Sequence, residues 1–469
     1  MIADTVFKQY DLRGIIGSDF PLEDVYDIGM AIASYFIHHG HGVKTVAVGA
    51  DGRVHSPVIK EKLCAALQDA GLNVLFIGVC PTPVLYFSLF TQPVQAGLMI
   101  TASHNGKEYN GIKICMNKES VWGDAIQEIK KLYNHHTAIQ AKERGSYEQN
   151  LLIPDYIFWL KEHFQHLIGT QISAVVDCGN GAAGTVLPAL IEAMQWKQVT
   201  LLFPEVDGNY PNHEADPTVP ENMEEVKNVL LTTDIEVGIG LDGDCDRMAP
   251  MTKQGELVPG DKLLALFAQG IVKEYPHVPV VFDIKCSSGL PELLTTWGAQ
   301  PIMSPSGHSI IKNQMKKHNA LLAGELSCHF FFKDRYFGYD DGIYSMMRLF
   351  ELLTNSGKSL HELLAIFPKK YSTSEIRIAC PDEKKGPIVD AMKNSFAAMK
   401  DVEVMTIDGI RVTMKSGWGM FRLSNTQPVV CLRFEGNSPE DLKTIKKVFL
   451  TYLQPYFDAT TLEAIQLAT

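Results

Sequence analysis

Two short polar stretches carry residue types that could transfer a phosphoryl group. Residues 101–105 (TASHN) place Ser103 directly after the apolar run 94–100, and residues 242–247 (DGDCDR) place three aspartates within five residues after the apolar run 235–241. A serine can be charged with a group and discharged again. Carboxylates at alternate loop positions can converge on Mg²⁺, which prefers carboxylate and phosphate oxygens. Together the two stretches predict the two halves of a phosphoryl-transfer centre.

The aspartate-rich loop has two alternative interpretations. A calcium loop of the EF-hand type needs Gly at its sixth position and Glu at its twelfth, whereas Arg247 and Lys253 stand there. A solvated turn is common for single aspartates, but three aspartates behind a buried strand would repel one another without a cation. We therefore predict that the metal ligands are Asp242, Asp244 and Asp246.

Taken alone, Ser103 is most simply a turn residue. Its neighbours change that interpretation, because His104 and Asn105 follow it and Lys113 comes ten residues later in the sequence YNGIK. A lysine near phosphates can neutralise charge, or act as a general acid or base if its pKa is lowered. The stretch is therefore predicted to supply a nucleophile together with its supporting charges.

A third stretch resembles a dinucleotide-binding loop. Residues 177–184 (DCGNGAAG) contain G-x-G-x-x-G between a strand and a helix, with Glu205 about twenty residues further on. The strand starts well inside the chain, and a strand–turn–helix unit needs glycines for tight packing in any case. An NAD-dependent dehydrogenase therefore stays as a rival hypothesis that an NAD titration can reject.

Two further clusters are candidates for ligand recognition. Residues 324–329 (GELSCH) place a carboxylate, a hydroxyl and an imidazole at alternate positions, so an extended backbone would put all three on one face, suited to sugar hydroxyls; the polar face of an edge strand is the alternative. Residues 422–428 (RLSNTQP) combine a guanidinium, two hydroxyls, an amide and turn N–H groups, which suits a phosphate. A plain turn fits the second cluster equally well.

Composition limits the class of protein. The 469 residues are 46% hydrophobic and 20% charged, with a formal net charge of −12, which disfavours a general nucleic-acid binder. The first residues lack a signal-peptide pattern, and no apolar stretch reaches the roughly 18 residues that span a bilayer. The nine cysteines form no C-x-x-C pair. We expect a cytoplasmic protein with reduced, buried thiols and no membrane partner.

The elements that must position these motifs follow two patterns. Over roughly the first 360 residues strands and helices alternate, which predicts α/β units with largely parallel sheets. Strands are expected at 43–48, 73–78, 97–100, 172–177, 199–203 and 278–284, and helices at 58–70, 154–167, 261–275 and 289–297, with a hairpin turn at 253–255. The last hundred residues instead predict an antiparallel α+β domain from about residue 368. Its strands are expected at 374–378, 402–408, 410–414, 418–423 and 429–435, and its helices at 385–399 and 439–453.

The motifs, in their order along the chain, resemble those of the α-D-phosphohexomutases. The matching segments are 7–14 (FKQYDLRG), 101–113, 242–247, 324–329 and 422–428, so the resemblance spans nearly the whole chain. The opening YDLRG and the sequence Glu325-Leu326-Ser327 are similar to the phosphomannomutase/phosphoglucomutase branch rather than to the phosphoglucosamine mutases, which stay as the alternative within the family.

The resemblance implies an α/β fold of three α/β/α mixed-sheet domains plus a C-terminal α+β domain around a central cleft. The expected boundaries are 1–150 for the phosphoserine-loop domain, 151–253 for the metal-loop domain, 254–367 for the sugar-recognition domain and 368–469 for the phosphate-binding domain. The implied reaction interconverts hexose 6-phosphate and hexose 1-phosphate, of mannose and/or glucose, through a phosphoserine enzyme and a hexose 1,6-bisphosphate. The partners would be small hexose phosphates, with no nucleic acid, and the protein a monomer or homodimer.

The same resemblance assigns roles to individual residues. One Mg²⁺ per site would be held by the three aspartates and the phosphate on Ser103. The implied catalytic residues are Ser103, Lys113, Arg247 and His329. The implied substrate contacts are Tyr10, Arg13, His104, Lys285, His308, Glu325, Ser327, Arg422, Ser424, Asn425 and Thr426.

This chain departs from the family pattern at four positions. Gly106 stands where proline is usual, which should loosen the serine loop, and Cys328 replaces a usual glycine, which affects the backbone of the sugar loop. Lys8 replaces an arginine and Gln427 a glutamate. None removes a group that performs the chemistry, which argues against an inactive binding protein of the same fold.

Overall fold

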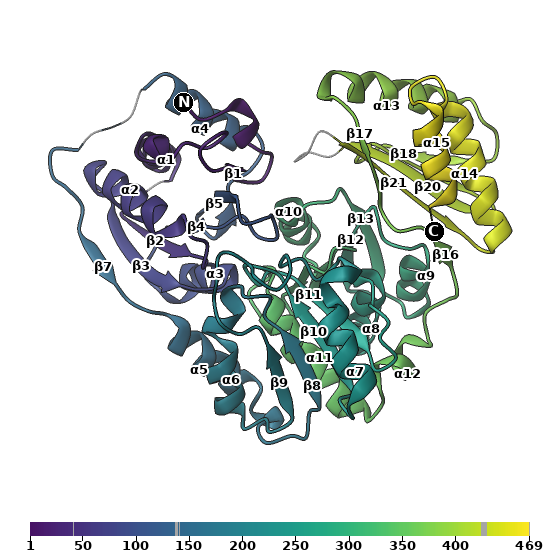
Figure 1. The fold of residues 1–469 in the computed structure, drawn as a ribbon, viewed down its shortest axis with the longest axis horizontal. Helices are drawn as coiled ribbons and strands as arrows, with labels where there is room; N and C mark the ends of the chain where they lie inside the picture. Colours follow the sequence, from purple (N-terminus) through teal and green to yellow (C-terminus); the bar gives the residue numbers. More distant parts are fainter. Residues whose placement is uncertain (41, 137–138, 140, 424–428, 469) are drawn as a thin grey trace. The chain divides into compact units, whose positions relative to one another are not determined.

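The chain, drawn as a ribbon in Figure 1, divides into two compact units. The computed structural model describes residues 1–40, 42–136, 139, 141–423 and 429–468. The first unit consists of Met1–Leu263 and Ser327–Leu364, and the second of Leu264–Leu326 and Ala365–Thr469. Each unit is described separately below.

The first unit contains two sheets with their helices. Its strands are β1 (Leu12–Ile15), β2 (Thr45–Ala50), β3 (Asn73–Val79), β4 (Ala96–Ile100), β5 (Tyr109–Met116), β6 (Glu119–Ser120), β7 (Tyr147–Gln149), β8 (Ala174–Asp177), β9 (Val199–Leu202), β10 (Val237–Leu241), β11 (Met248–Thr252) and β15 (Phe330–Phe332). Its helices are α1 (Val25–His39), α2 (Ser56–Asp69), α3 (Thr82–Thr91), α4 (Asp124–Asn134), α5 (Ile153–His163), α6 (Leu187–Met194), α7 (Glu224–Thr232), α11 (Gly342–Ser356) and α12 (Leu360–Leu364).

The first sheet is mixed, with strand order β1-β5-β4-β2-β3-β7 and β6 beside β5. Strands β2, β3, β4 and β7 pair in parallel, while β5 runs antiparallel to both β4 and β1. Alternate residues serve the two faces: Leu98 belongs to the core shared with α1 and α2, whereas an added Cβ on Gly97 would touch Leu85 of α3. The expectation of largely parallel pairing missed β5, which carries Lys113.

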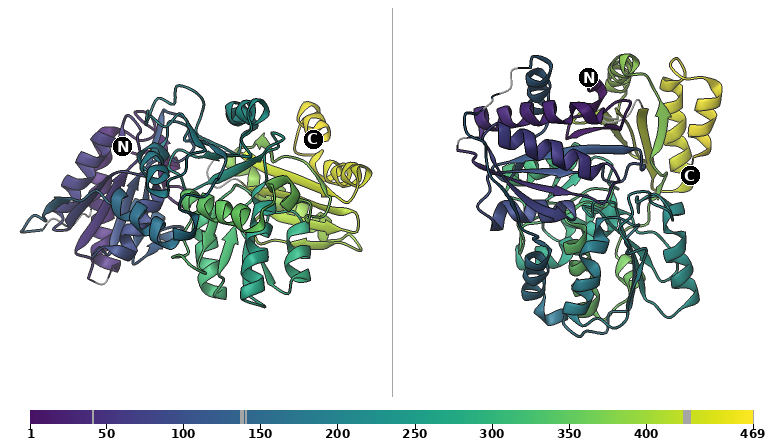
Figure 2. Two further views of the ribbon diagram at one scale, coloured as in Figure 1. Left: turned by 90° about the horizontal axis from the view of Figure 1, so that it is seen from below. Right: turned by 60° about the vertical axis from the view of Figure 1, so that its left-hand side comes forward.

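The second sheet has the order β11-β10-β8-β9. Strands β8, β9 and β10 are parallel, and β10 turns back into β11 as an antiparallel hairpin whose connection is residues 242–247. Helix α7 packs on β8 and β10, and α11 packs on β10 and β11. Figure 2 shows the ribbon from two further sides. The aspartate loop is therefore the tip of a hairpin packed between helices.

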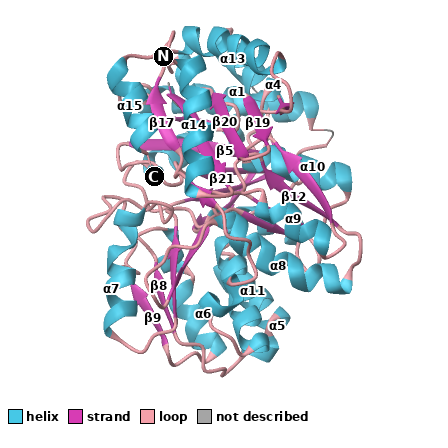
Figure 3. Cartoon of the chain, turned by 90° about the vertical axis from the view of Figure 1, so that its right-hand side faces the viewer, coloured by secondary structure: helices cyan, strands magenta, loops and turns pink. Residues whose placement is uncertain are grey.

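The second unit also has two sheets. The first is β13-β12-β14, all parallel, and the C-terminal sheet is β16-β21-β20-β19-β18, all antiparallel, with β17 also beside β21 (Figure 3). The strands are β12 (Pro279–Asp283), β13 (Gln300–Ser304), β14 (Leu322–Gly324), β16 (Tyr371–Ser372), β17 (Ile376–Ala379), β18 (Glu403–Met405), β19 (Ile410–Met414), β20 (Gly417–Leu423) and β21 (Val429–Gly436). The helices are α9 (Gly289–Thr296), α10 (His308–His318), α13 (Asp382–Ala397), α14 (Pro439–Leu453) and α15 (Ala459–Leu467); α8 (Gly260–Glu274) begins in the first unit.

The antiparallel C-terminal domain confirms the sequence prediction, and α14 begins and ends at the residues expected. Helix α15, which packs beside α14 (Figure 1), was not expected. All nine cysteines are buried thiols outside any disulfide, as predicted. Within the described part of the chain, no helix combines the length and apolarity needed to cross a bilayer.

Candidate phosphoserine and metal site

Ser103 lies in the loop after β4, with its hydroxyl directed at the aspartates. Its Oγ donates a hydrogen bond of 3.0 Å to Oδ2 of Asp242. The backbone of Ser103 is left-handed, with φ of 52°, and its N–H donates to Oγ1 of Thr101 at 2.8 Å. The residue is 2% exposed. A non-glycine residue held in this conformation marks a site where the surroundings impose the geometry.

Three carboxylates converge at the hairpin tip. One oxygen from each of Asp242, Asp244 and Asp246 lies within 4.8 Å of the other two, and all three residues are buried. Cys245, between them, is also left-handed, with φ of 62°, and its N–H donates to the carbonyl of Asp242 at 3.0 Å. The tight turn therefore places alternate side chains on one side, as the spacing predicted.

The charges in this cluster are incompletely balanced by the described residues. Burial and the neighbouring carboxylates of Asp246 and Asp244 hold the pKa of Asp242 well above its ordinary value. Oδ1 of Asp244 is buried without a hydrogen-bond partner among the described residues. Burial alone would raise the pKa of Asp246, but Lys113 and His329 lower it. A buried acceptor without a donor is costly, so the residues present fit a hard divalent cation.

Lys113 approaches the cluster from β5. Its Nζ donates to Oδ2 of Asp244 at 2.7 Å and to Oδ2 of Asp246 at 2.5 Å. Burial would lower the pKa of Lys113, but these two carboxylates raise it above its ordinary value, so the lysine is an ammonium here. The lowered pKa that a general base would need is absent from this arrangement.

Backbone contacts hold the aspartate loop on three sides. An added Cβ on Gly342, the first residue of α11, would lie 2.6 Å from the carbonyl oxygen of Arg247 and 2.8 Å from that of Cys245. The N–H of Gly342 donates to the same Cys245 oxygen at 2.8 Å. A Cβ on Gly243 would lie 2.6 Å from the carbonyl oxygen of Ser103, so the two loops meet backbone to backbone.

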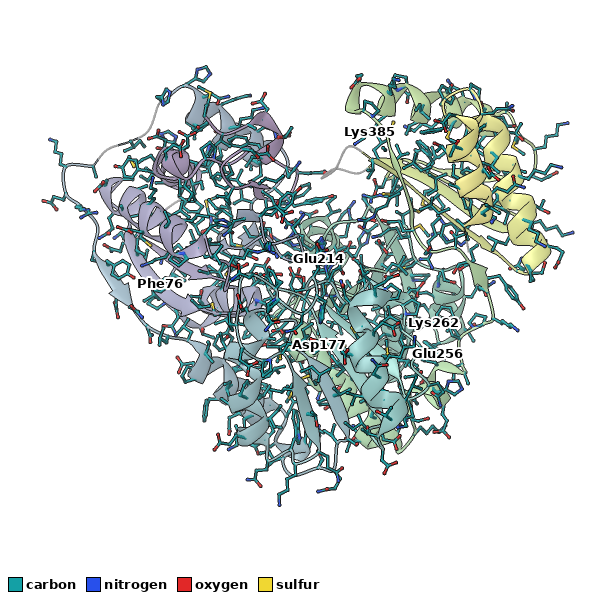
Figure 4. All side chains as sticks on the ribbon, in the orientation of Figure 1. Phe76, Asp177, Glu214, Glu256, Lys262 and Lys385 are labelled. Atoms are coloured by element: carbon teal, nitrogen blue, oxygen red, sulfur yellow. The ribbon has the colours of Figure 1, made fainter. Side chains whose placement is uncertain are left out.

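The glycine-rich loop 178–184 supports the third side of the aspartate loop. A Cβ on Gly181 would lie 2.8 Å from the carbonyl oxygen of Gly243, and one on Gly184 would lie 1.8 Å from that of Pro204. Asp177, labelled in Figure 4, accepts a hydrogen bond from the N–H of Gly179 at 2.7 Å. These glycines permit close packing, which was the alternative to dinucleotide binding.

His104 and Arg247 share a carboxylate that the sequence analysis missed. Nδ1 of His104 lies 3.6 Å from Oδ2 of Asp216, and Nη1 of Arg247 lies 4.0 Å from Oδ1 of the same residue. Burial and the charge of Arg247 hold the pKa of His104 well below its ordinary value, so the imidazole beside Ser103 is neutral. Asp216 comes from the connection between β9 and α7.

His329 meets Arg247 at the hairpin. Its Nε2 lies 3.2 Å from Nε of Arg247 and 3.2 Å from Oδ1 of Asp246, while its Nδ1 lies 3.3 Å from Oγ of Ser327. The main-chain N–H of Arg247 donates to Oδ1 of Asp242 at 3.1 Å. The structure therefore gathers the predicted Arg247, Ser327 and His329 around the aspartates.

Arg13 reaches the serine loop from β1. Its Nη1 donates to Oδ1 of Asn105 at 2.7 Å, and its Nε and Nη2 bind Asp11. Tyr10 is half-buried in the bend just before this strand.

The extended backbone expected for 324–329 is wrong. Strand β14 ends at Gly324, and a turn follows in which Cys328 is left-handed with φ of 66°. Glu325 therefore does not share a strand face with Ser327 and His329, and it belongs to the second unit while they belong to the first. A positive φ at residue 328 is the physical reason that glycine is the usual residue there.

In the second unit, Lys285 and Arg422 are linked through two aspartates and Ser306. Oδ2 of Asp283 accepts from Oγ of Ser306 at 2.9 Å and lies 3.5 Å from Nζ of Lys285. Oδ2 of Asp408 accepts from the N–H of Ser306 at 3.1 Å and from Nε of Arg422 at 3.0 Å.

The same network reaches the remaining predicted contacts. Oε1 of Glu325 accepts from the N–H of Gly307 at 2.7 Å, directly before His308 begins α10. Burial would lower the pKa of Lys285, but Asp283 and Glu375 raise it, so the amine is charged. Ser424, Asn425 and Thr426 lie outside the described residues.

Two arginines bind the loop that carries Lys285. Arg411 of β19 donates to the carbonyl oxygens of Ile284 and Cys286, and Arg433 of β21 donates to that of Lys285 at 2.6 Å. The Arg411 guanidinium stacks on the ring of Trp418, 3.6 Å from its centroid. We call Arg411 and Arg433 the arginine pair.

Sequence reasoning missed several residues that hold these groups. Arg53 and Asp51 lie under the serine loop, and Thr82 donates through Oγ1 to Asp244 at 2.5 Å. Asp340 has a carboxylate oxygen within 4.8 Å of Asp246 and His329. One signal was available: the Asp-Gly-Arg at 51–53 directly follows a buried parallel strand, where functional loops gather.

Comparison with known proteins identifies the family. Models described as "Phosphoglucomutase/phosphomannomutase" match in chain order: alpha/beta/alpha domain I over residues 4–140, domain II over 155–255, domain III over 259–371, and the C-terminal domain over 375–451.

Individual relatives agree. The chain is 40% identical to a phosphomannomutase/phosphoglucomutase of Pseudomonas putida, covering 96% of each chain. It is 36% identical to a phosphoglucomutase of Neisseria gonorrhoeae, covering 97% of each. A crystal structure of a phosphoglucomutase/phosphomannomutase family protein from Burkholderia thailandensis matches with a TM-score of 0.89 at 35% identity, covering 97% of this chain and 98% of that one. The chain therefore belongs to the phosphoglucomutase/phosphomannomutase family of enzymes.

Proposed function

We propose that this enzyme interconverts hexose 6-phosphate and hexose 1-phosphate, with mannose and/or glucose as the sugar, through a phosphorylated Ser103. The observation that carries the proposal is the 3.0 Å hydrogen bond from Ser103 Oγ to Asp242 at the point where three carboxylates converge. A hydroxyl held there can be esterified by phosphate beside a cation. Family membership and the names of the relatives support the substrate class.

The first step transfers the phosphoryl group from Ser103 to the free hydroxyl of the sugar. The bond between Ser103 Oγ and phosphorus breaks, a bond from the sugar oxygen to phosphorus forms, and the hydroxyl proton leaves for a protein base. His329 is the proposed base, since its ring lies among Arg247, Asp246 and Ser327. The Lys113 ammonium offsets negative charge on the transferring group and can return a proton to the serine oxygen.

Asp242, Asp244, Asp246 and the phosphate on Ser103 would hold one Mg²⁺ per site. When bound, Mg²⁺ supplies positive charge to the oxygens of the phosphoryl group. Oδ1 of Asp244, which has no hydrogen-bond partner among the described residues, supports this assignment, as do the burial and the mutual repulsion that raise the pKa of Asp242.

Residues of the second unit bind the substrate in this proposal. The cationic Lys285 and Arg422 contact the substrate's own phosphate, helped by Ser424, Asn425 and Thr426, while Glu325 and His308 contact the sugar. From the first unit, Tyr10, Arg13, His104, Arg247 and Ser327 complete the contacts. After transfer the product is a hexose 1,6-bisphosphate, which reorients so that its other phosphate returns to Ser103.

Removal of the nucleophile tests the proposal. Ser103→Ala should lower mutase turnover by several orders of magnitude, because it removes the hydroxyl that is proposed to carry the phosphoryl group. The matched control is Ser18→Ala, which replaces an exposed serine of the first unit and should leave turnover unchanged. Intact-mass measurement should find one added phosphoryl group on the wild type, mapped to Ser103. Near wild-type turnover of Ser103→Ala would reject the assignment.

Side-by-side assays on three sugar phosphates identify the preferred substrate. Turnover of mannose 1-phosphate or glucose 1-phosphate well above that of glucosamine 1-phosphate supports the proposal. Preference for the amino sugar would favour a phosphoglucosamine mutase, and no turnover of any of the three would favour a binding protein with the mutase fold.

We also propose the domain boundaries 1–150, 151–253, 254–367 and 368–469, which limited proteolysis would test. A cytoplasmic location and a monomeric or homodimeric state stay predictions of the sequence.

A further inference from the structure

Arg53 is a buried cation to which neither the family resemblance nor the proposed function above assigns a role. It follows β2 in the sequence Asp51-Gly52-Arg53, and its side chain is fully buried, with Nε 3.1 Å from Oδ2 of Asp51. A buried arginine that pairs with only one carboxylate leaves four further N–H groups to be bonded. Where those four bonds go indicates what the residue does.

All four remaining N–H groups bind the serine loop. Nη2 donates to the carbonyl oxygens of Ser103 at 2.8 Å and Asn105 at 2.6 Å. Nη1 donates to the carbonyl oxygens of Gly106 at 2.7 Å and Tyr109 at 3.0 Å. One guanidinium therefore sets the direction of four peptide groups on both sides of the nucleophile. It also holds the loop at Gly106, where the sequence predicted looseness.

The same guanidinium is fixed by the domain that supplies the aspartates. The ring of Tyr210 lies under it, 5.1 Å from the centroid to Cζ. A Cβ on Gly208 would lie within 2.6 Å of the backbone of Gly52 and Arg53, so residues 208–210 press on this turn. The Tyr210 hydroxyl lies 3.1 Å from the Cβ position of Gly243 in the aspartate loop.

We propose that Arg53 is a positioning residue that holds Ser103 in its left-handed conformation, with Oγ directed at Asp242, and that it sets the rate of phosphoryl transfer through the serine loop. This inference rests on the proposed role of Ser103. The left-handed backbone at Ser103 is otherwise unfavourable for serine, and the carbonyl of Ser103 is one of the four that Arg53 binds. Without the fork of donors the loop can relax and the hydroxyl can turn away.

The first test is Arg53→Lys, which keeps the charge but cannot make four directed bonds. We expect kcat to fall about 100-fold, as for a reacting group displaced by about 1 Å, while KM changes by less than about twofold. The matched control is Arg348→Lys, a buried arginine of the same unit that pairs with Asp334. It should lose stability without a comparable loss of kcat.

Rescue by an added cation distinguishes loss of the Arg53 hydrogen bonds from general damage to the fold. Arg53 lines a cavity of about 210 Å³ together with Asp51, Ser56 and Phe76, the last of which is labelled in Figure 4. Added methylguanidinium should enter the space left in Arg53→Ala and restore part of kcat, whereas methylammonium at the same concentration should not. Equal rescue by both cations, or rescue by neither in a folded Arg53→Ala, would overturn the proposal.

A crystal structure of Arg53→Lys gives a reading that does not depend on turnover. We expect Ser103 Oγ to leave Asp242. Retention of the 3.0 Å contact together with wild-type kcat would overturn the inference. If the wild type carries no phosphate on Ser103 and has no mutase activity, the proposed function fails. The position of the serine loop in crystals of the wild type and of Arg53→Lys then still decides whether Arg53 holds the loop. If Arg53→Ala does not fold, the kcat and the crystal structure of Arg53→Lys decide whether the proposal holds.

Discussion

Gly342 is expected to control the metal site although it supplies no ligand. Replacement by alanine would put a Cβ 2.6 Å from the carbonyl oxygen of Arg247 and 2.8 Å from that of Cys245. Ordinary contact begins at 3.4 Å, so the overlap is 0.6–0.8 Å. Both obstacles are backbone atoms of the aspartate loop, which cannot rotate away as a side chain could. The hydrogen bond from the N–H of Gly342 to Cys245 would lengthen as well.

The size of the effect follows from this overlap. Overpacking of a buried contact costs about 1–3 kcal/mol, which a folded enzyme can tolerate. Mg²⁺ demands near-octahedral oxygens at about 2.0–2.1 Å, so a loop displaced by most of an ångström would present its carboxylates poorly. Substitution of residues that support the metal ligands typically lowers metal affinity or activity by about 10–100-fold. We expect Gly342→Ala to weaken Mg²⁺ binding by about tenfold or more and to lower kcat similarly.

Calorimetric titration with Mg²⁺ and steady-state kinetics at several Mg²⁺ concentrations would measure this effect. The matched control is Gly270→Ala in α8, where an added Cβ meets nothing within 4 Å. A helix-interior alanine there should raise stability by about 0.5–1 kcal/mol and leave Mg²⁺ binding unchanged. Wild-type Mg²⁺ affinity and kcat in Gly342→Ala, or an equal loss in the control, would refute the reasoning.

Three further changes have defined outcomes. Burial raises the folded-state pKa of Asp341 to about 6, so the contribution of Asp341 to stability should fall by roughly 3 kcal/mol as pH rises from about 4 to 6. Melting curves should show the stability difference between the wild type and Asp341→Asn changing by that amount, and a constant difference would contradict this. Burial would lower the pKa of His213, but its hydrogen bond to Asp177 raises it, so the stabilisation is complete below about pH 6.5 and is lost as pH rises through the folded pKa. His213→Gln should therefore destabilise more at about pH 6 than at about pH 9, and an equal loss at both would contradict this. Arg422→Ala should raise KM for the hexose phosphate more than it lowers kcat, and an unchanged KM in steady-state assays would count against its phosphate contact.

Much of the site's local geometry could be predicted because it depends on contacts close in the sequence. Alternate aspartates after an apolar strand can converge in a tight turn, and Ser103 follows a strand in the same way. The prediction for 324–329 failed for a related reason. Alternation of polar side chains indicates a face only if the backbone is extended, and the left-handed Cys328 ends the strand geometry there.

The supporting residues were harder to predict because their partners are distant in the sequence. Arg53 binds carbonyls 50 to 56 residues away, and Thr82 binds Asp244 at a separation of 162 residues. Every residue has a main-chain carbonyl, so the sequence does not show which of them accept a side-chain hydrogen bond. Strand β5 was missed because residues 109–113 read as a functional motif rather than as a strand, although four of them are buried.

The arginine pair limits how the cations of the second unit can move. Arg411 and Arg433 lie on the sheet that also carries Arg422, and they bind the main chain at 284–286. Each charge-assisted bond of this kind contributes about 1.5–3 kcal/mol, so the main chain at 284–286 stays attached to the sheet that carries Arg422. In the proposed function this attachment limits the distance between the two cations that bind the substrate, so a sugar phosphate with a shorter or longer carbon chain should reach both less readily than a hexose phosphate.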